Sequence, residues 1–180
     1  MIVLVGASAS GKTELSKILF NKYGYTKCIT TTTRDPRIGE INDVDYHFLN
    51  KDEFLNLESK HAFFEVSTYQ NNYYGIQKND VNYQGLVIVD PSGANALIKE
   101  LKNDVFIVYV EANKSLRMDR MYQRSDEALL IKNRIINDDK VFDKANLLRI
   151  DLNIVNENHQ LDTLALEIHE KYLIHMHNNK

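Results

Sequence analysis

The chain of 180 residues is long enough to bury one full hydrophobic core and too short for two domains of ordinary size. Hydrophobic residues make up 43% of it and charged residues 26%, and the net charge of −3 excludes a general affinity for nucleic acid or anionic membranes. Cys28 is the only cysteine, which excludes an intramolecular disulfide and a thiolate zinc site, and we expect it to be a small buried side chain. The sequence therefore predicts a soluble, cytoplasmic, globular protein in which any phosphate-binding site is local.

The first segment predicts a strand, a loop and a helix. Residues 2–5 form a continuous apolar run, and Leu15, Ile18 and Leu19 recur at helical spacing until Gly24, a residue typical of helix C-termini. Between them, "GASASGKT" matches the motif G-x-x-x-x-G-K-[ST]. A position after a strand and before a helix is the context in which this motif forms a phosphate-binding loop.

The residue types of this loop explain its chemistry. The two glycines let the backbone wrap so that its N–H groups point at phosphate oxygens, while Lys12 reaches the β- and γ-phosphates and the Thr13 hydroxyl can coordinate Mg²⁺. We therefore expect ATP or GTP as the phosphoryl donor. The predicted donor-binding residues are Gly6, Ala7, Ser8, Ala9, Ser10, Gly11, Lys12 and Thr13.

The next notable segment is "TTTTRDPR", which begins at Thr30 and ends at Arg37. Threonine favours strands and Asp-Pro favours turns, so one interpretation is an edge strand that runs into a solvated turn. The other is an anion clamp, because arginine binds phosphate bidentately and threonine hydroxyls add donors around the same oxygens. The segment alone does not decide between the two.

Further elements alternate along the rest of the chain. Residues 86–89 and 105–110 are apolar runs of the kind that form strands buried on both faces, and residues 94–101 between them have helical spacing with Ser92 as a possible N-cap. Residues 152–155 are a weaker strand, followed by a helical pattern from Leu161. Alternating strands and helices predict a three-layer α/β core around a parallel sheet.

Two stretches interrupt this alternation. Residues 30–83 contain short strand-like pieces, "DYHF" and "AFFEV", around a short helix near residues 52–57, and predict an inserted small β unit. The second stretch, "RMDRMYQRSDEALLIKNR", is arginine-rich and helical, with Ser125 as a possible N-cap. We expect its first arginine, Arg117, to lie on a solvated helix face.

The ordered set of motifs resembles the guanylate kinase family. The resemblance rests on "GASASGKT", "TTTTRDPRIGEINDVDYHF", "FFEVSTYQNNYYG" and "VDPSG", and extends more loosely to "IVNEN" near the C-terminus. It implies the P-loop kinase fold as one domain, with a core at residues 1–29, 84–116 and 138–180. It also implies an inserted NMP-binding unit at residues 30–83 and a helical lid at residues 117–137.

The resemblance assigns roles to individual residues. It implies ATP and Mg²⁺ at the donor loop, with Thr13 as the metal ligand, and catalytic roles for Lys12, Arg37 and the lid arginines. Arg124 and Arg134 match those lid arginines best, and Arg120 matches less well. The acceptor residues that it implies are Thr30, Arg34, Arg37, Tyr46 and Tyr74 for the phosphate, and Glu65 and Asp90 for the base.

Guanine suits this pair of carboxylates. Its N1–H and 2-amino groups are donors, whereas the corresponding edge of adenine presents an acceptor that a carboxylate repels. The reaction then requires alignment of an acceptor phosphate oxygen with the γ-phosphorus, cancellation of charge and exclusion of water. We therefore expect ATP-dependent phosphorylation of GMP, and of dGMP, by a monomer or homodimer that binds neither nucleic acid nor membrane.

The sequence departs from the family pattern around the base. Ile76 follows "YYG" where the family usually has serine or threonine, and Ile88 and Ser92 replace an acid and a glutamine. Loss of one donor can weaken discrimination by about 1 to 3 kcal/mol. Ser125 also stands where glycine commonly follows the lid arginine.

These departures leave two alternatives. The first is a kinase of the same fold for another phosphorylated acceptor, such as another NMP or ribose 1,5-bisphosphate, which Ile76 favours and Arg37, Glu65 and "DYHF" disfavour. The second is a non-catalytic binding module, which the intact "SGKT" disfavours. A switch GTPase is disfavoured because the sequence lacks N-K-x-D.

Overall fold

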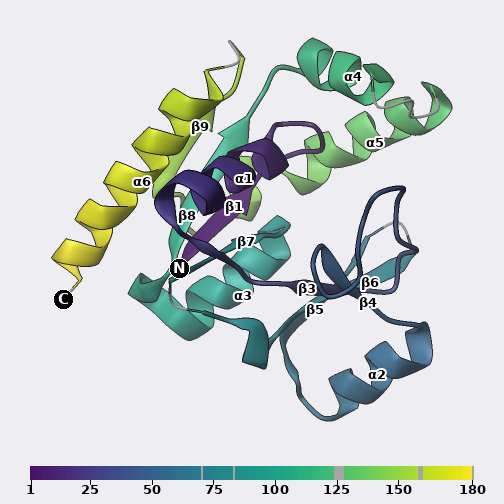
Figure 1. Cartoon of the computed structure of the whole chain (residues 1–180). Coiled ribbons are helices and arrows are strands. Elements are labelled where there is room, and N and C mark those ends of the chain that lie inside the picture. Colours follow the sequence, from purple (N-terminus) through teal and green to yellow (C-terminus); the bar gives the residue numbers. More distant parts are fainter. Residues whose placement is uncertain (70, 83, 124–127, 158–159, 180) are drawn as a thin grey trace.

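A parallel sheet lies at the centre of the fold, with helices on both faces and a second, smaller sheet beside it (Figure 1). The computed structural model describes residues 1–69, 71–82, 84–123, 128–157 and 160–179. The central sheet has five strands in the order β2-β7-β1-β8-β9, all parallel. Its strands are β1 (Ile2–Val5), β2 (Thr26–Lys27), β7 (Gly85–Ile88), β8 (Phe106–Glu111) and β9 (Leu152–Val155). The predicted parallel sheet is therefore confirmed, with two of the predicted strands shifted by one residue.

Strand β1 is buried on both faces because each face meets a separate layer of helices. Ile2 and Leu4 belong to one core cluster, and Val3 and Val5 belong to the other. The first cluster includes residues of α1 (Lys12–Tyr23) and α6 (Leu161–Asn178), and the second includes residues of α3 (Pro91–Leu101). Burial of a side chain of this size contributes about 1.5 to 3 kcal/mol, so a continuous apolar run is what this position requires.

The smaller sheet forms the inserted β unit that the sequence predicts. Its strand order is β4-β3-β6-β5, with β6 antiparallel to both of its neighbours. Its elements are β3 (Thr30–Thr32), β4 (Tyr46–Phe48), α2 (Lys51–Ser59), β5 (Phe63–Tyr69) and β6 (Asn72–Gln77). Asn50 and Glu53 form a capping box at the start of α2, and Phe54 of this helix stacks on Phe63 with ring centroids 4.6 Å apart.

Two further helices lie near the phosphate-binding loop (Figure 1). They are α4 (Lys114–Gln123) and α5 (Ala128–Val141). Met121 and Ile131, one from each helix, form a small core cluster with Ala9 of the loop. Short 3₁₀ helices complete the described structure at Lys78–Asp80, Lys102–Asp104 and Lys144–Asn146. None of the described helices combines the length and apolar character that a membrane crossing would need.

Two local predictions are wrong. Ser92 does not cap α3: the cap is Asp90, whose carboxylate accepts the backbone N–H of Gly93 at 2.9 Å, because Pro91 occupies the first helical position. Arg117 does not lie on a solvated face, since only 6% of it is exposed. It is buried because two aspartates of α5 pair with its guanidinium. The predicted cap at Ser125 lies outside the described residues.

Candidate active site

The phosphate-binding loop joins the end of β1 to the start of α1, as predicted. Gly11 caps α1 with φ 103°, and a Cβ there would lie 2.1 Å from Nδ2 of Asn156, so only glycine fits. The same Asn156 amide donates to the carbonyl of Ser10 at 2.8 Å. The loop is therefore held in shape by the residue that follows β9, far away in the sequence.

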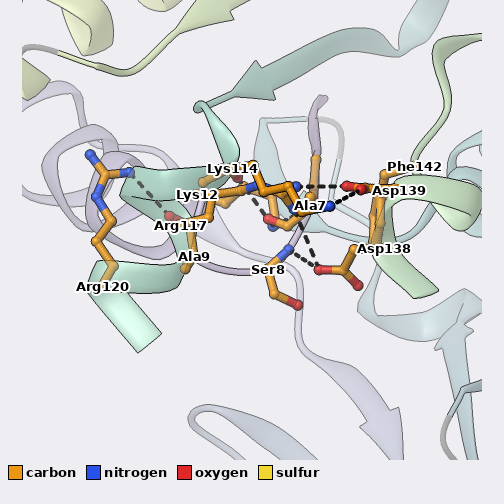
Figure 2. Close-up of polar contacts among 12 residues, drawn as sticks. Ala7, Ser8, Ala9, Lys12, Lys114, Arg117, Arg120, Asp138, Asp139 and Phe142 are labelled. Atoms are coloured by element: carbon orange, nitrogen blue, oxygen red, sulfur yellow. Dashed lines mark hydrogen bonds and ion pairs between the residues drawn. The ribbon is translucent and has the colours of Figure 1, made fainter. Parts of the chain in front are cut away.

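Lys12 points back over this loop. Its Nζ donates to the carbonyl oxygens of Gly6 at 2.5 Å and Ala7 at 2.9 Å, and lies 5.8 Å from the ring centroid of Phe142 (Figure 2). These contacts hold an ammonium group at the mouth of a loop whose backbone N–H groups can bind anions. Thr13 is exposed in the first turn of α1, where the partial positive charge of the helix N-terminus also favours phosphate.

The two arginines of the second basic segment are joined by one carboxylate. Nη2 of Arg34 contacts both oxygens of Glu40, at 3.0 and 2.9 Å, and Glu40 also accepts the backbone N–H of Arg37 at 2.7 Å. The Arg34 guanidinium lies over the rings of Tyr46 and Phe48, with centroid distances of 5.4 and 5.6 Å. The segment is thus an organised turn after a strand, and its Arg34 is fixed by ion pairing and stacking.

The hydroxyl groups predicted for the acceptor phosphate come from adjacent strands. Thr30 of β3 pairs with Tyr46 of β4, and Thr32 pairs with Tyr74 of β6. Burial raises the pKa of Tyr46, with Tyr74 adding to the effect, so its hydroxyl stays protonated at neutral pH and can donate. Strand pairing therefore brings together residues that lie far apart in the sequence.

The two predicted base-binding carboxylates each bind a serine. Ser67 donates to Asp90 at 3.0 Å, and the hydroxyl of Ser92 donates to Glu65. Burial raises the pKa of Glu65, and the negative charge of Asp90 raises it further, although the hydrogen bond from Ser92 opposes the shift. A ligand that offers two donors to these carboxylates would relieve their mutual repulsion.

One pocket gathers most of the predicted site. It is lined by Lys12 of the loop and by all seven predicted acceptor residues. Ile76 and Ile88, the two departures from the family pattern, also line it, and only 3% of Ile76 is exposed. The acceptor residues in the lining are Thr30, Arg34, Arg37, Tyr46, Glu65, Tyr74 and Asp90.

Neither of the two predicted lid arginines that the structure describes lines the pocket. Arg134 lies half-buried on α5 and is not among the residues that line the pocket. Arg120 donates to the carbonyls of Ala9 and Asn156, at 3.1 and 3.2 Å (Figure 2). Arg124 lies outside the described residues.

Sequence reasoning missed six other residues of the pocket lining, namely Ser67, Tyr69, Gly75, Val89, Gly93 and Phe142. Ser67 and Tyr69 follow Glu65 at steps of two along β5, so strand alternation could have placed all three on one face. Phe142 follows the end of α5, and no local pattern in the sequence marks it. Its place depends on how α5 packs against the loop.

A phosphate-binding loop at the end of a parallel strand, facing a second basic cluster across one pocket, defines a P-loop kinase with a donor side and an acceptor side. The family model described as guanylate kinase matches residues 1–172. The guanylate kinase of Ehrlichia chaffeensis is 32% identical over 167 residues, covering 88% of this chain and 79% of that protein. The guanylate kinase of Prochlorococcus marinus is 32% identical over 180 residues, covering 93% and 94%. This chain belongs to the guanylate kinase family.

The fold agrees with this assignment. The crystal structure of guanylate kinase from Anaplasma phagocytophilum superposes with a TM-score of 0.66 at 21% sequence identity, covering 94% of this chain and 82% of that one. At this level of identity the match shows a shared fold. It confirms the predicted P-loop kinase architecture.

Proposed function

We propose that the protein transfers the γ-phosphoryl group of ATP to GMP, giving ADP and GDP, and that dGMP is a second acceptor. The observation that carries the proposal is the single pocket that holds Lys12 on one side and the Arg34, Arg37, Glu65 and Asp90 groups on the other. Family membership supports the same reaction, and neither the structure nor the relatives favour another acceptor or a non-catalytic role.

Roles follow from the chemistry of each group. Lys12 binds the β- and γ-phosphates of ATP, and Arg37 and Arg134 cancel charge on the transferred group. Arg124 has the same proposed role. Arg34, Thr30, Tyr46 and Tyr74 bind the acceptor phosphate, which is already ionised at neutral pH and needs no general base. The proposed lid, residues 117–137, closes over the pocket and excludes water.

The residues of the site fit a Mg²⁺ ion that is held mainly by the phosphates of the bound ATP. Among the described residues, no group of three or more His, Cys, Asp or Glu side chains is arranged to hold a metal, and Ile88 leaves the pocket without a further acid. Mg²⁺ usually keeps several waters and binds substrate phosphates with few protein ligands. Thr13 would supply the hydroxyl ligand, and the ion would neutralise charge on the donor phosphates.

Guanine recognition rests on the two carboxylates. Glu65 and Asp90 accept the N1–H and 2-amino donors of guanine, and adenine cannot supply this pair of donors. Ile76 cannot donate to the base, so selectivity depends on Glu65 and Asp90 to a greater extent than in a site with serine at that position. We retain the division of the single domain into core, NMP-binding unit and lid as part of this proposal.

The test is magnesium- and ATP-dependent ADP release, with GMP, dGMP, IMP, AMP, UMP and ribose 1,5-bisphosphate supplied separately. We expect strong selectivity for GMP and dGMP. Activity on another acceptor alone would mean that Ile76 and Ile88 have changed the specificity, and inactivity with every acceptor would support a binding module.

A further inference from the structure

A buried carboxylate lies between the phosphate-binding loop and the acceptor-binding sheet. Asp138 of α5 is 0% exposed, and its Oδ2 accepts the backbone N–H of Ser8 at 2.7 Å (Figure 2). Its other oxygen, Oδ1, accepts the hydroxyl of Tyr69 at 3.1 Å. Ser8 belongs to the loop and Tyr69 ends β5, so one side chain of α5 connects the donor side of the pocket to the acceptor side.

A carboxylate is buried at this place because cations accompany it. Nη1 of Arg117 lies 3.8 Å from Oδ2 of Asp138, and Nη2 contacts Asp139 at 2.8 Å. Lys114 lies 3.0 Å from Asp139 on the exposed side. The four side chains carry balanced formal charges, so the cluster adds little net negative charge beneath a loop that must attract phosphate.

The two groups that Asp138 binds both line the pocket, whereas Asp138 itself is not part of the lining. Burial raises the pKa of Tyr69 and the nearby Asp138 raises it further, so the phenol keeps the proton that it donates. A purely packing role would not require a hydrogen bond from each side of the pocket to one carboxylate. A charged, fully buried residue is also a costly choice for packing alone.

We propose that Asp138 is a positioning residue, which fixes the acceptor strand β5 against the phosphate-binding loop through Tyr69 and Ser8. The proposal rests on the proposed function, because it concerns the alignment of the two nucleotides. Phosphoryl transfer depends on that alignment, so a loosened connection lowers the rate of transfer to the acceptor. Binding of ATP alone is affected little, because the loop keeps its glycines, Lys12 and the support of Asn156.

The test is a double-mutant cycle on kcat/KM for GMP and on KM for ATP. We expect Tyr69→Phe to lower kcat/KM for GMP about fivefold, the effect of one hydrogen bond, with KM for ATP unchanged. In an Asp138→Ala background, the same Tyr69→Phe change should cost clearly less than in the wild-type protein, because one of the two side-chain partners of the hydroxyl is already absent and only Asn137 remains. Asp138→Asn should recover much of the activity that Asp138→Ala loses, since an amide can still accept from Ser8.

The matched control is Tyr73→Phe on β6, whose ring stacks on Phe54 at 5.5 Å; it should have wild-type kinetics. Wild-type values for Tyr69→Phe would overturn the proposal, as would a full fivefold loss in the Asp138→Ala background, which would mean that the hydroxyl acts through Asn137 or directly on substrate. Tighter ATP binding in Asp138→Asn would also overturn it, in favour of inhibition by Asp138. If Asp138→Ala does not fold, Tyr69→Phe and Asp138→Asn decide. Lack of GMP phosphorylation by the wild-type protein would instead refute the proposed function.

Discussion

The two regions that we propose to bind phosphate are built in different ways. The donor loop uses backbone N–H groups, and its glycines leave no space for a side chain, as the 2.1 Å approach to Asn156 at Gly11 shows. The proposed acceptor side presents side chains from several elements, with Arg34 held by Glu40 and by two aromatic rings. A site made of backbone tolerates little change, whereas one made of side chains can change its specificity by single substitutions.

The largest effect that we expect is at the donor loop. Lys12→Ala should lower kcat about a thousandfold, because Lys12 is the only lysine among the described residues that line the pocket. The measurement is ADP release at saturating GMP, with circular dichroism to show that the variant is folded. Retention of more than about a tenth of the activity would mean that the donor side does not depend on Lys12.

The ion pair between Arg117 and Asp138 should contribute to the free energy of unfolding. Arg117→Ala leaves Asp138 buried without its cation and should lower the free energy of unfolding by about 3 kcal/mol. The control is Lys114→Ala, which breaks an ion pair whose lysine side chain is 56% exposed and should cost less than about 1 kcal/mol. Urea unfolding measures both, and equal costs would contradict the burial of Arg117.

On the acceptor side, Arg34→Ala should mainly weaken acceptor binding. We expect the KM for GMP to rise about thirtyfold, with a smaller loss of kcat from poorer alignment, because a charged hydrogen-bonding group is lost. The KM for ATP should stay near its wild-type value. If both the KM for GMP and kcat were unchanged, the clamp assignment would be wrong.

A smaller effect should sharpen specificity. Ile76→Ser places a hydroxyl on the lining of the acceptor pocket and should improve the preference for GMP over other monophosphates about tenfold. Ile76 is 3% exposed, so Ile76→Thr, which keeps a branched side chain, is the variant to use if the serine destabilises the core. The measurement is the ratio of kcat/KM values for GMP and AMP. An unchanged ratio in a folded variant would mean that Ile76 does not face the base.

The smallest effect concerns pH. Burial raises the pKa of Glu65 above its ordinary value of 4.5, so the folded protein holds this proton more tightly than the unfolded chain. The stability that this proton contributes is complete below the unfolded pKa and is lost as pH rises through the folded pKa. Glu65→Gln should therefore gain stability relative to wild type as the pH rises from 4.5 to neutrality, which urea unfolding measures. A constant difference across that range would contradict the shift.

Much of the fold follows from local patterns. The run at Ile2–Val5 predicted a buried strand, and the glycines and Lys12 after it predicted a phosphate-binding loop, because these features depend on the backbone geometry of adjacent residues. Gly24 predicted the end of α1 for the same reason. The prediction that Ser92 caps α3 was wrong, because Asp90 followed by Pro91 forms the start of this helix. The local preference of serine for the cap position did not distinguish it from Asp90.

What only the tertiary structure decided is which side chains meet across the pocket. The sequence determined the parallel core and the loop, and through its resemblance it predicted the residues proposed for the acceptor site. It did not determine that Arg117 is buried, that Ser67 binds Asp90, or that Asp138 connects Ser8 to Tyr69. Local motifs encode backbone conformation, but the environment of a charge depends on elements that approach from more than a hundred residues away, as α5 approaches the loop.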